Sequence, residues 1–148
     1  MQQGGGFVRK SVKLSPGPTE YLVAGEGPDA VFLSRLDGPP PGPVALRMTQ
    51  KFRVWIPLLS LNEDAAGAGS PPTSFGTAAL IAEFVDQLIA RPCEVVGNST
   101  GARVAAWFAI LYPAKVAQLV LMAPAGFQPA DALTQPGTGQ IRDEALIA

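Results

Sequence analysis

The order of segments in residues 93–123 constrains the fold more than any other feature. Residues 93–98 are predicted to form a buried strand, residues 100–112 a helix that ends before Pro113, and residues 116–123 a second strand. Both strands are largely apolar rather than strictly alternating, which is typical of parallel strands buried on both faces. A strand–helix–strand unit of this kind predicts an α/β fold with right-handed crossovers.

The earlier part of the chain extends the same pattern. The best helix spans residues 74–90, where Ile81, Phe84, Val85 and Leu88 recur at helical spacing. We expect an N-terminal β-hairpin followed by alternating strands and helices, with further strands at 7–14, 20–24, 29–36 and 52–59 and a short helix at 44–50. The expected architecture is a mostly parallel sheet with helices on both faces. It occupies residues 7–127, between a flexible tail at 1–6 and a partly disordered start of a lid or linker at 128–148.

Composition excludes several classes of function. The formal net charge is -1 and no basic stripe occurs, so neither nucleic acid nor a membrane is an expected partner. No signal-peptide pattern follows the basic residues near the start, and we expect a cytoplasmic protein. Cys93, the single cysteine, is expected to be a buried structural residue. The chain contains no histidine, which excludes a His-ligated metal site and any Ser–His dyad built from this chain alone.

The turn between the strand at 93–98 and the following helix carries the candidate chemistry. It reads Gly97-Asn98-Ser99-Thr100-Gly101, a G-x-S-x-G pattern with a strand before it and a helix after it. Such a tight turn strains the serine backbone, and the flanking glycines avoid side-chain clashes. It also places Ser99 at a helix N-terminus, where the N–H of Thr100 can face a developing negative charge. A tight turn without chemistry in a doubly wound fold is the simpler alternative.

Several segments, taken together, resemble the α/β-hydrolase superfamily between about Tyr21 and Phe127. They occur in the family's order and spacing: residues 25–28 with the strand after them, the Asp-Ala-Ala-Gly-Ala-Gly-Ser loop at 64–70, the turn at 97–101, and the segments 112–116 and 119–126. The resemblance implies that Ser99 is the nucleophile and that the Thr100 backbone N–H is one oxyanion donor. It places Ser34 and Arg35 at the second oxyanion position, where His-Gly is usual in the family.

The resemblance also implies what the sequence lacks. The family continues with a lid, further strands, an acidic residue and a histidine, so the expected fold is a truncated α/β-hydrolase. The strand at 116–123 would then be an exposed apolar edge, for which we expect a homo-oligomer or a second chain. No metal or organic cofactor is implied, because acyl transfer by serine needs none.

Three functions remain open from the sequence. The first is a serine hydrolase of ester- or amide-type bonds that acts on a small-molecule substrate, with its base and acid missing from this chain. The second is a non-catalytic binding or scaffold protein of the same fold, favoured by Ser34-Arg35 in place of His-Gly and by the absence of histidine. The third is a truncated fragment without a function of its own. The sequence does not identify the substrate.

Overall fold

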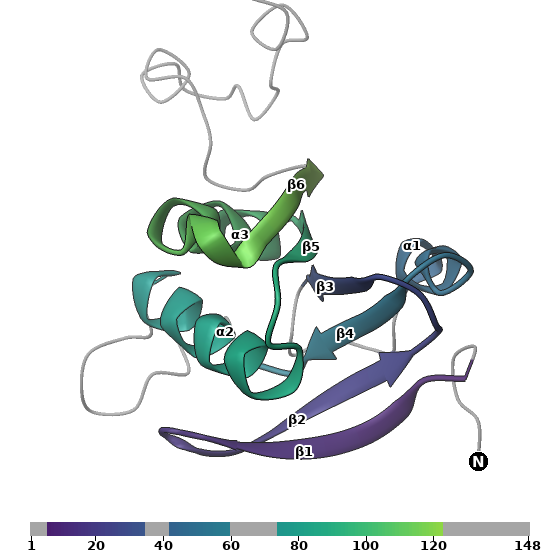
Figure 1. Ribbon diagram of the computed structural model, residues 1–148, viewed down its shortest axis with the longest axis horizontal. Coiled ribbons are helices and arrows are strands. Elements are labelled where there is room, and N and C mark those ends of the chain that lie inside the picture. The colour runs from purple at the N-terminus through teal and green to yellow at the C-terminus, as the bar shows by residue number, and fades with distance from the viewer. Residues whose placement is uncertain (1–5, 35–41, 60–73, 123–148) are drawn as a thin grey trace, which may run out of the picture.

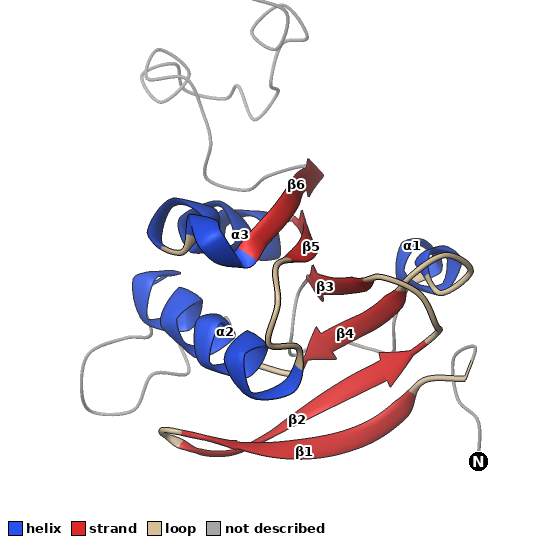
Figure 2. Cartoon of the chain, viewed as in Figure 1, coloured by secondary structure: helices blue, strands red, loops and turns tan. Residues whose placement is uncertain are grey.

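The computed structural model describes residues 6–34, 42–59 and 74–122. Its elements follow in the order β1 (Val8–Leu14), β2 (Gly17–Ala24), β3 (Asp29–Leu33), α1 (Pro43–Met48), β4 (Arg53–Pro57), α2 (Ser74–Leu88), β5 (Cys93–Asn98), α3 (Thr100–Leu111), a 3-10 helix (Pro113–Lys115) and β6 (Val116–Met122) (Figures 1 and 2). Gly6 is the only described residue of the expected tail, and the expected lid or linker at 128–148 lies outside the described ranges.

The strands form one six-stranded sheet in the order β1-β2-β4-β3-β5-β6. β1 and β2 form an antiparallel hairpin, and β2 also pairs antiparallel with β4. The other neighbours, β4 with β3, β3 with β5 and β5 with β6, are parallel. The N-terminal hairpin and the mostly parallel sheet are confirmed. β1 and β6 form the two edges, at the bottom and top of Figure 1.

Helices cover both faces of the sheet, as expected. α2 and α3 lie on one face, and α1 lies on the other (Figure 1). The alternation of β3 shows how the strands serve two cores: Val31 and Leu33 belong to the cluster under α2 and α3, whereas Phe32 belongs to the cluster that includes Ala45 of α1. All five residues of β3 are buried. Within the described ranges, no helix is both long enough and apolar enough to cross a membrane.

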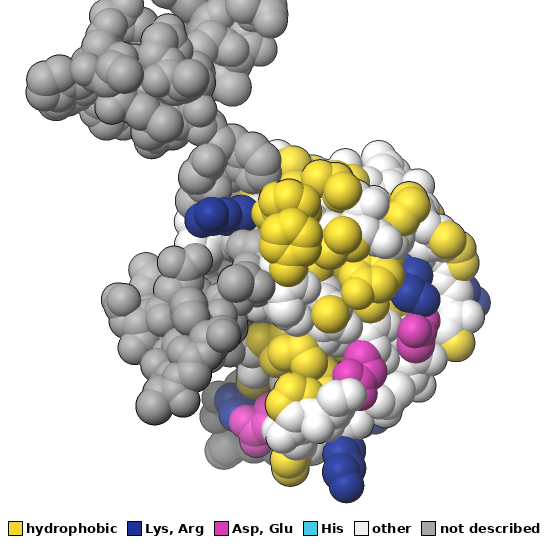
Figure 3. Space-filling view, turned by 90° about the vertical axis from the view of Figure 1, so that its left-hand side faces the viewer, with side chains coloured by type: hydrophobic (Ala, Val, Ile, Leu, Met, Phe, Trp, Pro, Cys, Tyr) yellow, Lys and Arg dark blue, Asp and Glu magenta, His cyan; other side chains and the backbone are white. Residues whose placement is uncertain are grey.

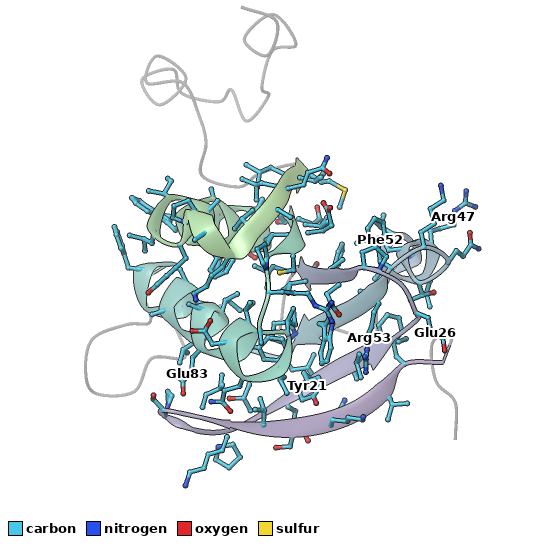
Figure 4. The ribbon with its side chains drawn as sticks, in the orientation of Figure 1. Tyr21, Glu26, Arg47, Phe52, Arg53 and Glu83 are labelled. Atoms are coloured by element: carbon cyan, nitrogen blue, oxygen red, sulfur yellow. The ribbon has the colours of Figure 1, made fainter. Side chains whose placement is uncertain are left out.

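The hairpin corrects one predicted boundary. β2 begins at Gly17 rather than at residue 20, because Leu14 pairs directly with Gly17 and only Ser15 and Pro16 remain for the turn. β2 contains a proline, Pro18, near its start, and this residue pairs with Lys13 of the edge strand β1. The turn is fastened to α2, since the Ser15 hydroxyl donates to Glu83 Oε2 at 2.9 Å. Glu83 is labelled beside this end of the hairpin in Figure 4.

Other boundaries shift by a few residues. β3 ends at Leu33 and β4 at Pro57, earlier than predicted, and α2 ends at Leu88 rather than at residue 90. α2 stops early because Ala90 takes a left-handed conformation with φ 58°, and its N–H donates to Val85 O at 2.8 Å. The 3-10 helix at Pro113–Lys115 was not predicted.

A paired buried carboxylate lies at the amino ends of the parallel strands. Asp29, at the start of β3, is 8% exposed. Its Oδ1 accepts a hydrogen bond from Trp55 Nε1 at 2.9 Å, and its Oδ2 lies 3.1 Å from Arg91 Nε. Arg53, labelled in Figure 4, covers the Trp55 ring at 4.9 Å from its centroid. The charge of Asp29 is therefore neutralised and hydrogen-bonded inside the protein.

Candidate functional site

Ser99 lies between the carboxyl end of β5 and the first residue of α3. Its backbone has φ 57° and ψ -123°, outside the conformations that residues with a side chain ordinarily adopt. The turn is held from the sheet side, because Ser99 N donates to Met122 O, the last residue of β6, at 3.1 Å. The Ser99 side chain makes no capping hydrogen bond to α3. The serine hydroxyl is thus not used to satisfy the helix N-terminus.

The two flanking glycines are required by close backbone contacts. A Cβ at Gly97 would lie 2.6 Å from Ala102 Cα and 2.8 Å from Ala105 Cβ, so this glycine lets α3 cross β5 closely. A Cβ at Gly101 would lie 2.1 Å from Leu33 O and 2.7 Å from Ser34 N. Gly101 therefore packs the first turn of α3 directly against the carboxyl end of β3.

The contact at Gly101 brings part of the predicted site together. Ser34, half-buried, follows β3 and has its backbone N beside the first turn of α3. Thr100 is exposed and begins that helix. Arg35, also predicted at this position, lies outside the described residues. The structure thus places the Ser34 backbone next to the turn that carries Ser99.

The sequence reasoning missed the contribution of β6 to the site. Met122 O anchors Ser99 N, yet the two residues are far apart in the sequence and no local pattern links them. The parallel pairing of Asn98 with Met122 explains the contact, because both strands end at the same edge of the sheet. Only the order of the strands in the sheet, and no sequence motif, could have predicted this contact between Met122 and Ser99.

The described titratable groups near this part of the sheet do not form a metal site. Among the described residues, no group of three or more His, Cys, Asp or Glu side chains is arranged to hold an ion. Cys93 lies at the opposite end of β5 from Ser99 and is 2% exposed. Burial raises the pKa of its thiol to about 12, with the charges of Asp29 and Glu94 contributing. Cys93 is a buried, protonated thiol, as predicted.

Comparison with solved structures identifies similar folds. The chain superposes on a candidate lipase from Acinetobacter baumannii AYE with a TM-score of 0.71 and 22% identity, covering 85% of this chain and 44% of the other. A membrane phospholipase A described as a bacterial virulence factor superposes with a TM-score of 0.66 and 26% identity, covering 85% of this chain and 42% of the other. A candidate epoxide hydrolase from Pseudomonas aeruginosa superposes with a TM-score of 0.61 and 26% identity, covering 78% of this chain and 41% of the other. The chain therefore spans less than half the length of these proteins.

Sequence comparison gives the family. No curated protein matches the chain significantly. The sequence pattern of the alpha/beta hydrolase fold family matches residues 47–139, more than half of the chain and including the turn at Ser99. Together with the strand order and the similar folds, this match shows that the chain belongs to the alpha/beta hydrolase fold family.

Proposed function

We propose that Ser99 is the nucleophile of an ester-hydrolysing site. The observation that carries the proposal is the backbone of Ser99, which holds φ 57° and ψ -123° at a turn where two glycines permit close packing. Strained backbone that is retained in a well-packed turn is characteristic of functional sites. A serine in this strand–turn–helix arrangement stands at the carboxyl edge of the sheet, where a substrate can reach it.

The chemistry follows from the groups around the turn. Ser99 Oγ attacks the ester carbonyl and loses its proton to a base, and the carbonyl oxygen becomes an oxyanion. The Thr100 and Ser34 backbone N–H groups are the proposed donors to it. The alcohol then leaves with a proton, and water releases the acid from the acyl-serine. The chain has no histidine, so we propose that the base is a histidine outside these 148 residues.

Two similar structures favour an ester as the substrate class. The candidate lipase and the phospholipase A are named for hydrolysis of lipid esters, and each is matched over 85% of this chain. Proteins described as epoxide hydrolases, from Pseudomonas aeruginosa and Vigna radiata, open a different functional group and are matched over 78% of this chain. A serine nucleophile with backbone oxyanion donors suits acyl transfer, because the intermediate is an ester of that serine.

Chemical rescue tests the proposal on the chain itself. We expect a fluorophosphonate probe to label Ser99 slowly and imidazole in the buffer to accelerate that labelling, because imidazole supplies the proton acceptor that the chain lacks. A positioned base contributes a rate enhancement of about 10²–10⁴-fold, and a freely diffusing base should recover only part of it. Intact mass and peptide mapping measure the rate and the position of the label.

Two variants make the rescue specific. Ser99→Ala should abolish the labelling, whereas Ser11→Ala, which removes an exposed hydroxyl from β1, should leave it unchanged. Label on folded protein that persists in Ser99→Ala, or no label at any imidazole concentration, would contradict the proposal. The absence of label would favour the second candidate, a non-catalytic binding protein, for which the absence of histidine is the supporting observation.

A further inference from the structure

The edge strand β1 has the composition of a sheet edge that stays open. It carries three cationic residues, Arg9, Lys10 and Lys13, within seven positions, and its residues from Val8 to Ser11 are all exposed. Natural sheets commonly place cationic side chains on a free edge, where they keep copies of the same chain from pairing. Within the described ranges, β1 pairs with β2 alone. The strand therefore offers a free row of backbone groups among basic side chains.

The pairing with β2 indicates which backbone groups lie on the free side of β1. Lys13 pairs with Pro18, which has no N–H to donate, and this indicates a pair of the kind that is not hydrogen-bonded. The two kinds of pair alternate along an antiparallel ladder, so Arg9 and Ser11 belong to the same kind as Lys13. The Lys13 carbonyl agrees with this direction, because it accepts a hydrogen bond from Gln87 Nε2 of α2 at 3.0 Å. The N–H and C=O groups of Arg9 and Ser11 thus point away from β2.

The positive charge of β1 is only partly neutralised. Arg9 forms an ion pair with Glu20 of β2 at 2.8 Å, with both side chains more than half exposed. Within the described ranges, neither Lys10 nor Lys13 lies in an ion pair. Figure 3 views the molecule from the side of the hairpin turn and shows a basic side chain projecting at the lower end, where the hairpin lies, with hydrophobic side chains gathered higher up. This edge favours a partner that carries negative charge.

We propose that β1 binds an extended acidic segment of another protein, which pairs antiparallel with it as an added strand. Backbone groups of the segment bond to Arg9 and Ser11, and its carboxylates lie opposite Arg9, Lys10 and Lys13. This binding does not depend on the proposed hydrolysis, because β2, β4 and β3 separate β1 from β5, the strand that leads to Ser99.

A designed peptide tests the mode of pairing. In the acetylated and amidated peptide Glu-Val-Thr-Glu-Glu, the threonine is placed opposite Ser11 and the three glutamates opposite the three cations. Titration followed by ¹H–¹⁵N correlation NMR should shift the amide signals of Arg9 and Ser11 most. N-methylation of the threonine, whose N–H faces β1, should abolish these shifts, whereas N-methylation of the valine, whose N–H faces away, should leave them. Equal effects of the two methyl groups, or no shift at millimolar peptide, would overturn the proposal.

Charge reversal tests the recognition of the acidic side chains. Lys10→Glu combined with Lys13→Glu should weaken binding of the peptide by about tenfold, because two attractive pairs become repulsive. Lys51→Glu, the same change at an exposed residue outside the hairpin, should leave the affinity within about twofold of the wild type. Circular dichroism confirms that the variants are folded. Equal binding by the double variant and the wild type would overturn the proposal and leave the cations with the role of keeping the edge unpaired.

Discussion

The two ends of the parallel strands are stabilised in different ways. At the amino ends, the buried Asp29 is neutralised by Arg91 and hydrogen-bonded by Trp55. At the carboxyl ends, Ser99 keeps an unfavourable backbone conformation, and glycine replaces side chains where β3, β5 and α3 meet. Each end holds one non-glycine residue with positive φ, Ala90 at the amino ends and Ser99 at the carboxyl ends, whereas the buried ion pair of Asp29 lies at the amino ends. We therefore expect the amino ends to be most sensitive to the loss of a polar partner, and the carboxyl ends to be most sensitive to changes in the backbone of the turn.

The largest expected effect lies at the carboxyl ends. Gly101→Ala should lower the free energy of unfolding by about 3 kcal/mol, because the new methyl group meets the Leu33 carbonyl and neither backbone can yield freely. Urea denaturation measures the change. Gly42→Ala is the matched control, since a Cβ there has no atom within 4 Å, and it should change stability by less than about 1 kcal/mol. Equal losses in the two variants would show that the Gly101 contact is not what holds α3 against β3.

The amino ends should respond next most strongly. Asp29→Ala should cost about 2 kcal/mol, because Trp55 Nε1, buried beside it, loses its hydrogen-bond acceptor. Asp86→Ala, which removes the exposed partner of Lys115, should cost less than about 1 kcal/mol. Thermal unfolding followed by Trp fluorescence compares the two. If both cost the same, the burial of Asp29 contributes nothing to stability and the contrast between the two ends fails.

The smallest effect has the opposite sign. Ser99→Gly should raise the free energy of unfolding by about 1 kcal/mol, because glycine adopts φ 57° and ψ -123° with little strain. Ser99→Ala keeps a Cβ and should not stabilise. At the amino ends, Ala90 has nearly the same φ, 58°, but a conformation that ends α2. Ala90→Gly should therefore stabilise by less, about 0.5 kcal/mol. A loss of stability in Ser99→Gly would mean that the turn carries no strain.

Much of this arrangement could be predicted from local sequence. β5, α3 and the turn between them follow from an apolar run, a glycine at each end of the turn and a proline after the helix. The sequence predicts that a side chain at either glycine would clash with its surroundings. It does not predict which atoms the side chain would meet, because Gly101 meets Leu33 only once β3 lies beside β5. The Asp29, Trp55 and Arg91 cluster was missed for the same reason. Its members are brought together by strand order and share no local pattern.

The position of β3 has a consequence for how the chain reaches this structure. β3 pairs with β4 on one side and with β5, more than sixty residues later, on the other. During synthesis, the most buried strand has both of its neighbours only after residue 98 has left the ribosome. We expect the hairpin to form early from its local contacts, whereas the centre of the sheet requires a segment that is distant in the sequence. Stopping the chain before β5 would leave β3 with one open side, the form most prone to aggregate.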